Sequence, residues 1–278
     1  MTIVIPAARY ISAAKALSPI AYFPAQGRYD DGVVSTDGIA STLLGRVYPN
    51  DSWLDETFEP PTELGRYLTT YLHANAQDAG LSLPGHLSKL TPMVQSGAWT
   101  FTAWVRPEGT GYKQALMALN GSHGGHVSLH WQSNGKGIWA EDGNGHTVEG
   151  PTAFSTVNRW SMVAMTVSGQ TATLYVDGVQ VGSGQLDAWP QGATATSAFL
   201  LTMNNVGGAN CTFGSANHLG FFPALSAAQV KALNDTGRHV ATSGADPAYW
   251  LPWTGEDPNF GGTQAYYTGQ YETNLRNP

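Results

Sequence analysis

Residues 99–107 read WTFTAWVRP, and this stretch decides the fold class because two kinds of side chain alternate along it. In a β-strand, successive side chains point to opposite faces. One face then carries the residues Trp99, Phe101, Ala103 and Val105. Trp104 lies on the other face with two threonines, where a solvated strand usually carries polar residues. The pattern predicts a strand with one face in a core and leaves open what contacts Trp104.

The composition favours a folded protein built from short strands. The 278 residues are 42% apolar and 11% aromatic, but only 12% are charged, and 33 are glycine. This mixture is typical of strands joined by tight turns. A net charge of −7 without a basic run excludes nucleic acid as a partner. A single cysteine, Cys211, excludes an internal disulfide, and we expect neither a signal peptide nor membrane insertion.

A series of strand-like segments between residues 80 and 222 predicts an all-β sandwich. Asp177-Gly178 is the dipeptide preferred in two-residue hairpin turns, and a second hairpin turn is expected at Ser168-Gly169. After the strands, Ser226 and Gln229 form a capping box, which predicts one short helix near residues 226–236. Gly237 stands where a C-terminal cap belongs.

Three parts of the chain are expected. Residues 1–24 form an irregular N-terminal arm that ends in the first strand, IAYFP, and residues 238–278 form an irregular C-terminal arm. Residues 25–237 form the sandwich domain, within which residues 25–79 read as an insertion. In that insertion, ELGRYLTTYL fits a helical stripe and a strand about equally well.

The order of several motifs resembles that of a known family. The motifs are SPIAYFP, GLSLPG before WTFTAWVRP, RWSMVAMTVSGQTATLYVDGVQVGS and LGFFPALSAAQVKAL. Together they resemble the laminin-G-like, concanavalin A-like lectin/glucanase domains found in bacteriophage virion proteins. The resemblance covers residues 80–237, with residues 18–24 as the first strand. It implies a two-sheet antiparallel jelly roll, and its motifs specify the fold better than the function.

No catalytic residues are predicted. Catalytic members of the superfamily carry E-x-D-x-x-E on one strand, and this sequence lacks that motif. Glu141 and Asp142 are adjacent and would point to opposite faces of a strand. The acidic stretch NDSWLDETFE (residues 50–59) has two interpretations, a solvated loop or a carboxylate pair beside a sugar-stacking tryptophan.

Metal binding has two candidate sets. His123, His126 and His130 have a ligand-like spacing, but on a strand His126 and His130 would lie roughly 13 Å apart, too far for one zinc ion. Calcium at the rim of the sandwich, as in several laminin-G-like domains, is the other hypothesis. Its candidate ligands are Asp30, Asp31, Asp142 and Asn144, although such residues also form Asx turns without an ion. No other cofactor is expected.

A glycan site is the hypothesis raised by Trp104. His130 and Trp139, like Trp104, lie out of phase with the core residues of their strands. If the three side chains shared an open sheet face, their rings would stack on a pyranose. The alternative is that the chain's own segments cover Trp104.

The function predicted from the sequence is that of a non-enzymatic virion surface protein of a bacteriophage, in capsid decoration or at the head surface, made in the host cytoplasm. Its partners would be other virion proteins, further copies in a homo-oligomer, and host-surface or environmental glycans. The alternatives are a free lectin module or tail adhesin, and a glycoside hydrolase. The C-terminal arm is rich in tyrosine and tryptophan, which are enriched at protein–protein interfaces, and these residues predict an assembly surface. They are Tyr249, Trp250, Trp253, Tyr266, Tyr267 and Tyr271.

Overall fold

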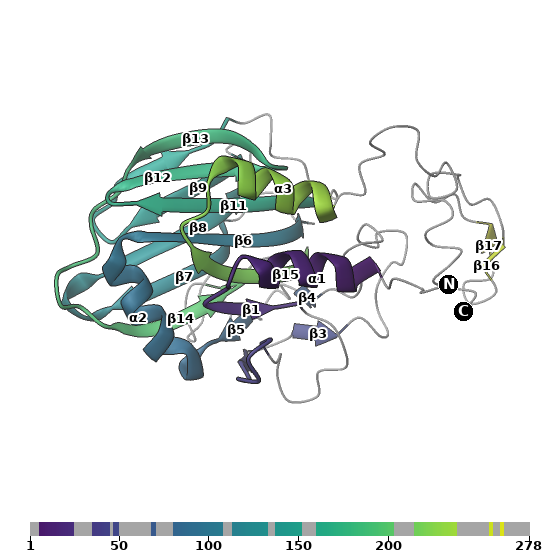
Figure 1. The fold of residues 1–278 in the computed structure, drawn as a ribbon, viewed down its shortest axis with the longest axis horizontal. Helices are drawn as coiled ribbons and strands as arrows, with labels where there is room; N and C mark the ends of the chain where they lie inside the picture. The colour runs from purple at the N-terminus through teal and green to yellow at the C-terminus, as the bar shows by residue number, and fades with distance from the viewer. Residues whose placement is uncertain are drawn as a thin grey trace.

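Two antiparallel β-sheets packed face to face form the body of the protein, as the computed structural model shows (Figure 1). The structure describes residues 6–24, 35–44, 47–49, 68–70, 80–107, 113–132, 137–151, 160–202, 214–237, 256–257 and 262–263. This architecture confirms the predicted all-β jelly-roll sandwich.

The first sheet, called sheet I, has eight strands in the described part of the chain. Their spatial order is β13 (Val179–Gln185), β12 (Thr171–Val176), β11 (Ser161–Ser168), β6 (Ala98–Pro107), β15 (Gly214–Pro223), β4 (Leu68–Thr70) and β3 (Val47–Pro49), and β1 (Ala21–Phe23) pairs with β15. Within the ambiguous segment ELGRYLTTYL, residues Leu68–Thr70 form the strand β4.

The second sheet, sheet II, has seven strands among the described residues. Their order is β10 (Thr147–Glu149), β9 (Gly137–Asp142), β8 (His126–Gln132), β7 (Lys113–Gly121), β14 (Ala195–Leu200), β5 (Gly80–Ser82) and β2 (Thr42–Leu44). Four further elements in the described part of the chain are short, namely the 3-10 turns η2 (Pro84–His86) and η3 (Ser122–Gly124) and the paired strands β16 (Glu256–Asp257) and β17 (Gly262–Thr263).

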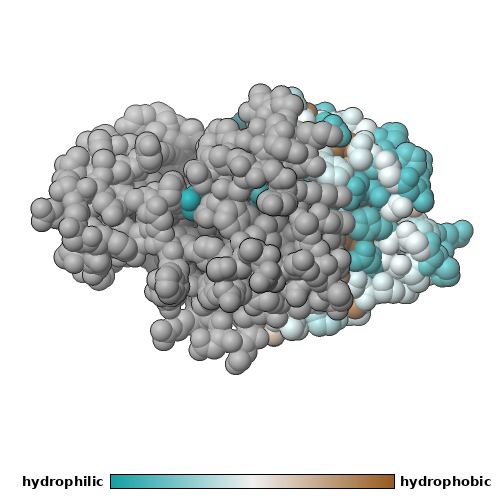
Figure 2. Space-filling view, turned by 180° about the vertical axis from the view of Figure 1, so that it is seen from behind, coloured by the Kyte–Doolittle hydropathy of each residue, from teal (hydrophilic) through white to brown (hydrophobic). Residues whose placement is uncertain are grey.

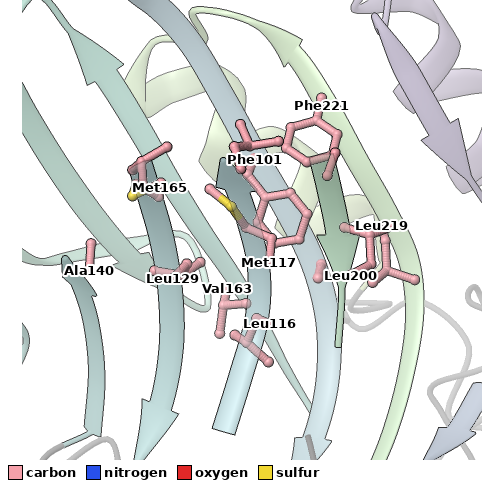
Figure 3. Packing of buried hydrophobic residues seen from close by; sticks show 14 of the residues in the cluster. Phe101, Leu116, Met117, Leu129, Ala140, Val163, Met165, Leu200, Leu219 and Phe221 are labelled. Atoms are coloured by element: carbon pink, nitrogen blue, oxygen red, sulfur yellow. The ribbon is translucent and has the colours of Figure 1, made fainter. Parts of the chain in front are cut away.

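The main core lies between the sheets and confirms the alternation read from WTFTAWVRP. Phe101 of β6 is fully buried and its ring centroid lies 5.2 Å from that of Phe221. Met117 and Leu129 of sheet II lie in the same cluster (Figure 3). Large aliphatic and aromatic side chains buried in this way supply most of the favourable free energy of folding.

The hairpin turns follow the residue types that were read as turn signals. Asp177 and Gly178 have φ angles of 54° and 76°, the two positive values that a type I′ turn requires. The preceding turn lies one residue later than predicted. Strand β11 ends at Ser168 and β12 begins at Thr171, so Gly169, with φ 62°, and Gln170 form the turn.

Two edge strands from different sheets close one side of the sandwich. A Cβ atom built on Gly182 of β13 would lie 2.5 Å from the carbonyl oxygen of Glu149 in β10. Only a residue without a side chain allows these two backbones to approach so closely. Gly182 therefore fixes how tightly the edges of sheets I and II meet.

The predicted helix is present as α3 (Ala227–Gly237), with its capping box. The backbone N–H of Gln229 donates to Ser226 Oγ at 3.3 Å, and the N–H of Ser226 donates to Gln229 Oε1 at 2.9 Å. The prediction of a single helix and an irregular N-terminal arm is wrong. Helix α1 (Pro6–Ala16) begins at a proline, which is well tolerated in the first helical turn because that turn needs no N–H donor.

Helix α2 (Leu87–Ser96) is the other helix that the sequence did not predict. It lacks a side-chain cap at its N-terminus, and Pro92 lies inside it. Both features hide a helix from pattern reading. No helix in the described segments is both long and apolar enough to cross a bilayer.

Helices α1 and α3 lie side by side over the outer face of sheet I (Figure 1), and they cover Trp104. Trp104 is fully buried in a second apolar cluster that includes Tyr10 of α1 and Val230 of α3. A Cβ atom on Gly237 would lie 2.5 Å from Trp104 Cζ2. Gly237 is thus required for the close approach of α3 to this ring. The sequence had suggested a different reason, a C-terminal cap.

Candidate functional site

The three residues predicted to bind glycan do not share a surface. Trp104 lies on sheet I beneath two helices, whereas His130 and Trp139 lie on sheet II. The imidazole of His130 stacks on the indole of Trp139, with ring centroids 4.5 Å apart and an angle of 24° between the planes. Both rings are buried. The alternation along each strand was correct, but the assumption that the three residues share one open face was wrong.

A row of hydrogen-bonded polar side chains crosses four strands of sheet II, and we call it the polar ladder. Its members are Ser197 (β14), Asn120 (β7), His126, Ser128 and His130 (β8) and Glu141 (β9). The hydroxyl of Ser128 lies 3.1 Å from His126 Nε2 and 2.8 Å from His130 Nε2. The two histidines therefore meet at a serine hydroxyl, and the ladder ties neighbouring strands together.

The partners of the ladder allow one consistent assignment of its hydrogen-bond donors and acceptors. Asn120 Nδ2 donates to Ser197 Oγ at 3.0 Å, so Asn120 Oδ1 is left to accept from His126 Nδ1 at 2.7 Å. His126 Nε2 then accepts from the Ser128 hydroxyl, which in turn accepts from His130 Nε2. His130 Nε2 also lies 3.3 Å from Glu141 Oε1. In this assignment each ring nitrogen and each amide or hydroxyl group has one consistent set of hydrogen-bond roles.

A second polar cluster ties the β9–β10 hairpin to the loop after β13, and we call it the Asp142 latch. Asp142 Oδ1 accepts from the backbone N–H groups of Asn144 at 2.8 Å and His146 at 3.0 Å. Asp142 Oδ2 accepts from His146 Nδ1 at 2.9 Å and from the backbone N–H of Asp187 at 2.7 Å. Asn144 Nδ2 donates to Asp187 Oδ2 at 2.5 Å. Four donors thus occupy the carboxylate of Asp142.

The latch does not fit the calcium site that the sequence suggested. The structure brings Asp142 and Asn144 together with His146 and Asp187. However, calcium binds six to eight oxygens, whereas here both oxygens of Asp142 already accept hydrogen bonds and an imidazole lies among the groups. This is the hydrogen-bonded Asx arrangement that was the alternative interpretation.

Several other predicted residues lie outside the described part of the chain. They are the calcium candidates Asp30 and Asp31, the acidic stretch 50–59, Cys211 and the proposed assembly residues Tyr249, Trp250, Trp253, Tyr266, Tyr267 and Tyr271.

The latch shifts the ionisation of its two titrating partners in opposite directions. Burial acts to raise the pKa of Asp142, but hydrogen bonds from the N–H groups of Asp187 and Asn144 and from His146 outweigh it and lower that pKa. The hydrogen bond to Asp142 and the charges of Asp142 and Asp187 raise the pKa of His146. The ionised pair is therefore stabilised by the fold.

The Asp142 latch should be most stable at pH values between the lowered pKa of Asp142 and the raised pKa of His146. A lowered Asp142 pKa contributes stability above the unfolded value of about 3.9, which is lost as pH falls. A raised His146 pKa contributes stability below the unfolded value of about 6.5, which is lost as pH rises through the folded value. Hydrogen exchange at the amides of Asn144 and Asp187, divided by the intrinsic rate at each pH, should show this maximum in protection. A flat profile, equal to that of D142N, would contradict the assignment.

Next to the latch, a pocket opens at one end of the sandwich, and we call it the rim pocket. It lies between the end of α2, the start of β6, the β11–β12 turn and the loop after β13. The buried side chains Val94, Trp99, Val127 and Leu186 form its apolar floor. This end of the molecule is at the left of Figure 1 and at the right of Figure 2, where the described surface is mostly hydrophilic.

Polar and aromatic groups surround the floor of the rim pocket. Gln170 and Asp187 are exposed, and Trp189 is half-buried. The Trp189 Nε1–H donates to Ala193 O at 3.2 Å, and its ring packs against Gly121, where a Cβ atom would collide with it. Trp189 is therefore held rigidly. An apolar floor with a few fixed polar groups is the usual composition of a small-molecule site.

Sequence reading missed the rim pocket, although it had named two of its lining residues, His126 and Asp142, as candidate metal ligands. His146 and Asp187 lie 41 positions apart in the sequence and meet only because β13 returns beside β10. One signal was available, namely the segment LDAWPQG (residues 186–192), which places a tryptophan in a loop with proline and glycine. Loops fixed on a rigid scaffold carry binding residues more often than strands do.

Comparisons with known proteins agree with this fold. By structure, the chain is similar to domain 4 of AbnA, a GH43 extracellular arabinanase from Geobacillus stearothermophilus, solved in complex with arabinotriose. The TM-score is 0.53 and the identity 18%, over 78% of this chain and 98% of that one. It is also similar to Trypanosoma rangeli sialidase in complex with sialic acid, with a TM-score of 0.58 and 10% identity over 80% of this chain and 33% of that one.

A third similar structure is the binding domain of botulinum neurotoxin DC in complex with rat synaptotagmin II. Its TM-score is 0.56 and the identity 8%, over 84% of this chain and 53% of that one. A search of the curated proteins finds no match. The sequence profile of the concanavalin A-like lectin/glucanase superfamily matches residues 75–231, more than half of the chain. Together with the two-sheet sandwich, this match shows that the chain belongs to the concanavalin A-like lectin/glucanase superfamily.

Proposed function

We propose that the protein is a non-enzymatic, glycan-binding surface protein of a bacteriophage virion, and that it binds saccharide in the rim pocket. The observation that carries the binding proposal is the composition of this pocket. A rigid Trp189 and an apolar floor lie next to the exposed side chains of Gln170 and Asp187. A sugar ring has an apolar face and a hydroxylated edge, so this combination suits it. The lectin-like fold supports the same proposal.

The proposal that the protein binds glycan without cleaving it rests on the contacts of the two carboxylates of β9, Glu141 and Asp142. Glycosidases need two carboxyl groups about 5–9.5 Å apart that both face the sugar. Here Glu141 contacts His130 in the polar ladder, and Asp142 is held by the latch on the opposite face of the same strand. Both therefore have structural roles. Release of reducing ends from a panel of bacterial polysaccharides, abolished in a Glu141→Gln variant, would instead favour the hydrolase alternative.

The virion proposal rests on the sequence and on what the fold suits. A chain with one cysteine fits assembly in a reducing cytoplasm, and the aromatic residues near the C-terminus fit docking on other virion proteins. A decorating protein on the head surface would display the rim pocket outward. Co-sedimentation with purified particles, and labelling of heads by an antibody to the chain, tests this location. Recovery only as free protein would favour the free lectin, and labelling of tails would favour the adhesin.

Loss of one exposed amide should weaken glycan binding without affecting the fold. The Gln170 side chain is exposed in the β11–β12 turn at the edge of the rim pocket. We expect Gln170→Ala to lower the affinity for a saccharide several-fold, since one hydrogen bond is typically worth about 1 kcal/mol. Calorimetric titration of the full chain measures the change. The matched control is Gln180→Ala, an exposed glutamine at the other end of β13. Equal affinities for both variants would place binding elsewhere.

A further inference from the structure

We infer that the rim pocket selects uncharged saccharides and rejects acidic ones such as sialic and uronic acids. This inference rests on the proposed function and adds a ligand class to it. Its basis is the distribution of charge. Among the described residues that line the pocket, the ionisable ones are His126, Asp142 and Asp187, and none is lysine or arginine.

The carboxylate of Asp187 is the charge that a ligand would meet. Its side chain is 42% exposed, whereas that of Asp142 is 2% exposed and belongs to the latch. Asn144 Nδ2 donates to Asp187 Oδ2, and His146 Nδ1 lies 3.6 Å from Asp187 Oδ1. These contacts fix the direction of the carboxylate but leave much of it open to solvent. A fixed, open acceptor of this kind suits sugar hydroxyl groups, which are donors.

The one basic side chain of the latch, His146, is already paired with carboxylates of the protein. His146, when protonated, pairs with Asp142 at 2.9 Å and with Asp187 at 3.6 Å. Its charge therefore only partly offsets two carboxylates, and the cluster stays negative at neutral pH.

An acidic sugar would lack a partner in such a pocket. Recognition of a carboxylate usually depends on arginine or lysine, which supply a countercharge and paired donors. Without them, the ligand must lose water from its carboxylate and approach a second negative charge, and both steps are unfavourable. An uncharged sugar has neither cost, and its hydroxyl groups can donate hydrogen bonds to Asp187 while its apolar face contacts the pocket floor.

The test uses the full chain and pairs of saccharides that differ in charge, namely galactose with galacturonic acid, glucose with glucuronic acid, and lactose with 3′-sialyllactose. We expect the neutral member of at least one pair to bind, with an affinity at least about tenfold above its acidic partner. The affinity should change little between 50 and 500 mM salt, because the ligand has no charge to be screened.

The variant Asp187→Asn separates the explanation from a merely structural effect. It keeps the shape of the side chain and removes the charge. It should therefore lower the affinity for the neutral saccharide roughly tenfold and reduce the difference in affinity between the neutral and the acidic member of a pair. The matched control is Asp235→Asn, an aspartate on α3 paired with Lys231. Circular dichroism and thermal unfolding verify that both variants fold.

The outcomes separate this inference from the proposed function. Preferential, salt-independent binding of neutral saccharides that D187N weakens and D235N leaves unchanged supports it. Equal or tighter binding of acidic saccharides, strengthened by D187N, overturns the ligand class and leaves glycan binding intact. Binding to no member of any pair would overturn the proposed function and the inference with it.

Discussion

Replacing Trp104 with alanine should lower the free energy of unfolding by about 3–5 kcal/mol, as for other large aromatic truncations in a core. Trp104 is fully buried between sheet I and the two covering helices, where its ring lies 6.4 Å from that of Tyr10 in an edge-on arrangement. Removing it leaves a cavity that helices α1 and α3 can only partly fill. Denaturant titration followed by circular dichroism measures the change.

The control for this prediction is Val179→Ala. Val179 is 57% exposed on the edge strand β13, so its loss should change stability by about 0.5 kcal/mol or less. A Trp104→Ala protein with unchanged stability and abolished glycan binding would contradict the structure and restore the sheet-face hypothesis.

The second large effect is expected where the sheet edges meet. Gly182→Ala places a methyl group 2.5 Å from the carbonyl oxygen of Glu149 and 3.1 Å from its carbon, both backbone atoms. Because a backbone cannot rotate away as a flexible side chain can, β10 and β13 must separate. We expect a loss of about 1–3 kcal/mol, the usual cost of overpacking.

Hydrogen exchange locates this second effect. A larger increase in exchange rate, relative to the unsubstituted protein, in β10 and β13 than in the central strands β6 and β11 would show that the edge opens first. The comparison is Gln180→Ala, an exposed change on the same strand that should leave exchange unaltered. If Gly182→Ala is as stable as the Gln180 variant, the two edges are not in close contact.

Local patterns predicted what depends on neighbours along the chain. Alternation placed Phe101 and Ala103 in the core, the Asp177-Gly178 pair gave its turn, and Ser226 with Gln229 marked the start of α3. Each of these features is decided within a few residues. Helix α1 was missed, because residues 6–16 are helical where they pack on sheet I, and that packing depends on segments far away in the sequence.

The candidate site depends on contacts between distant segments, which is why the sequence did not locate it. Alternation shows that Trp104, His130 and Trp139 point away from the core, but it does not show that the first lies on sheet I and the other two on sheet II. Nor does it show that α1 and α3 pack over one of these faces. The latch likewise depends on a loop that joins Asp187 to Asp142 across 45 positions.

The structure therefore moves the glycan-binding hypothesis from the sheet faces to the end of the sandwich. The aromatic residues that seemed available on the strands are buried, and the exposed polar groups that surround an apolar floor lie in loops. Residues such as Gln170 can change there without disturbing the core, so the ligand class and the stability of the fold can vary separately.

A crystal structure of the full chain with its best-binding neutral saccharide tests the central claim most directly. The account predicts that the sugar lies in the rim pocket, with a hydroxyl group hydrogen-bonded to Asp187, a contact to Gln170, and its apolar face toward the pocket floor and Trp189. A saccharide bound instead on the outer face of either sheet, with the rim pocket unchanged, would contradict it.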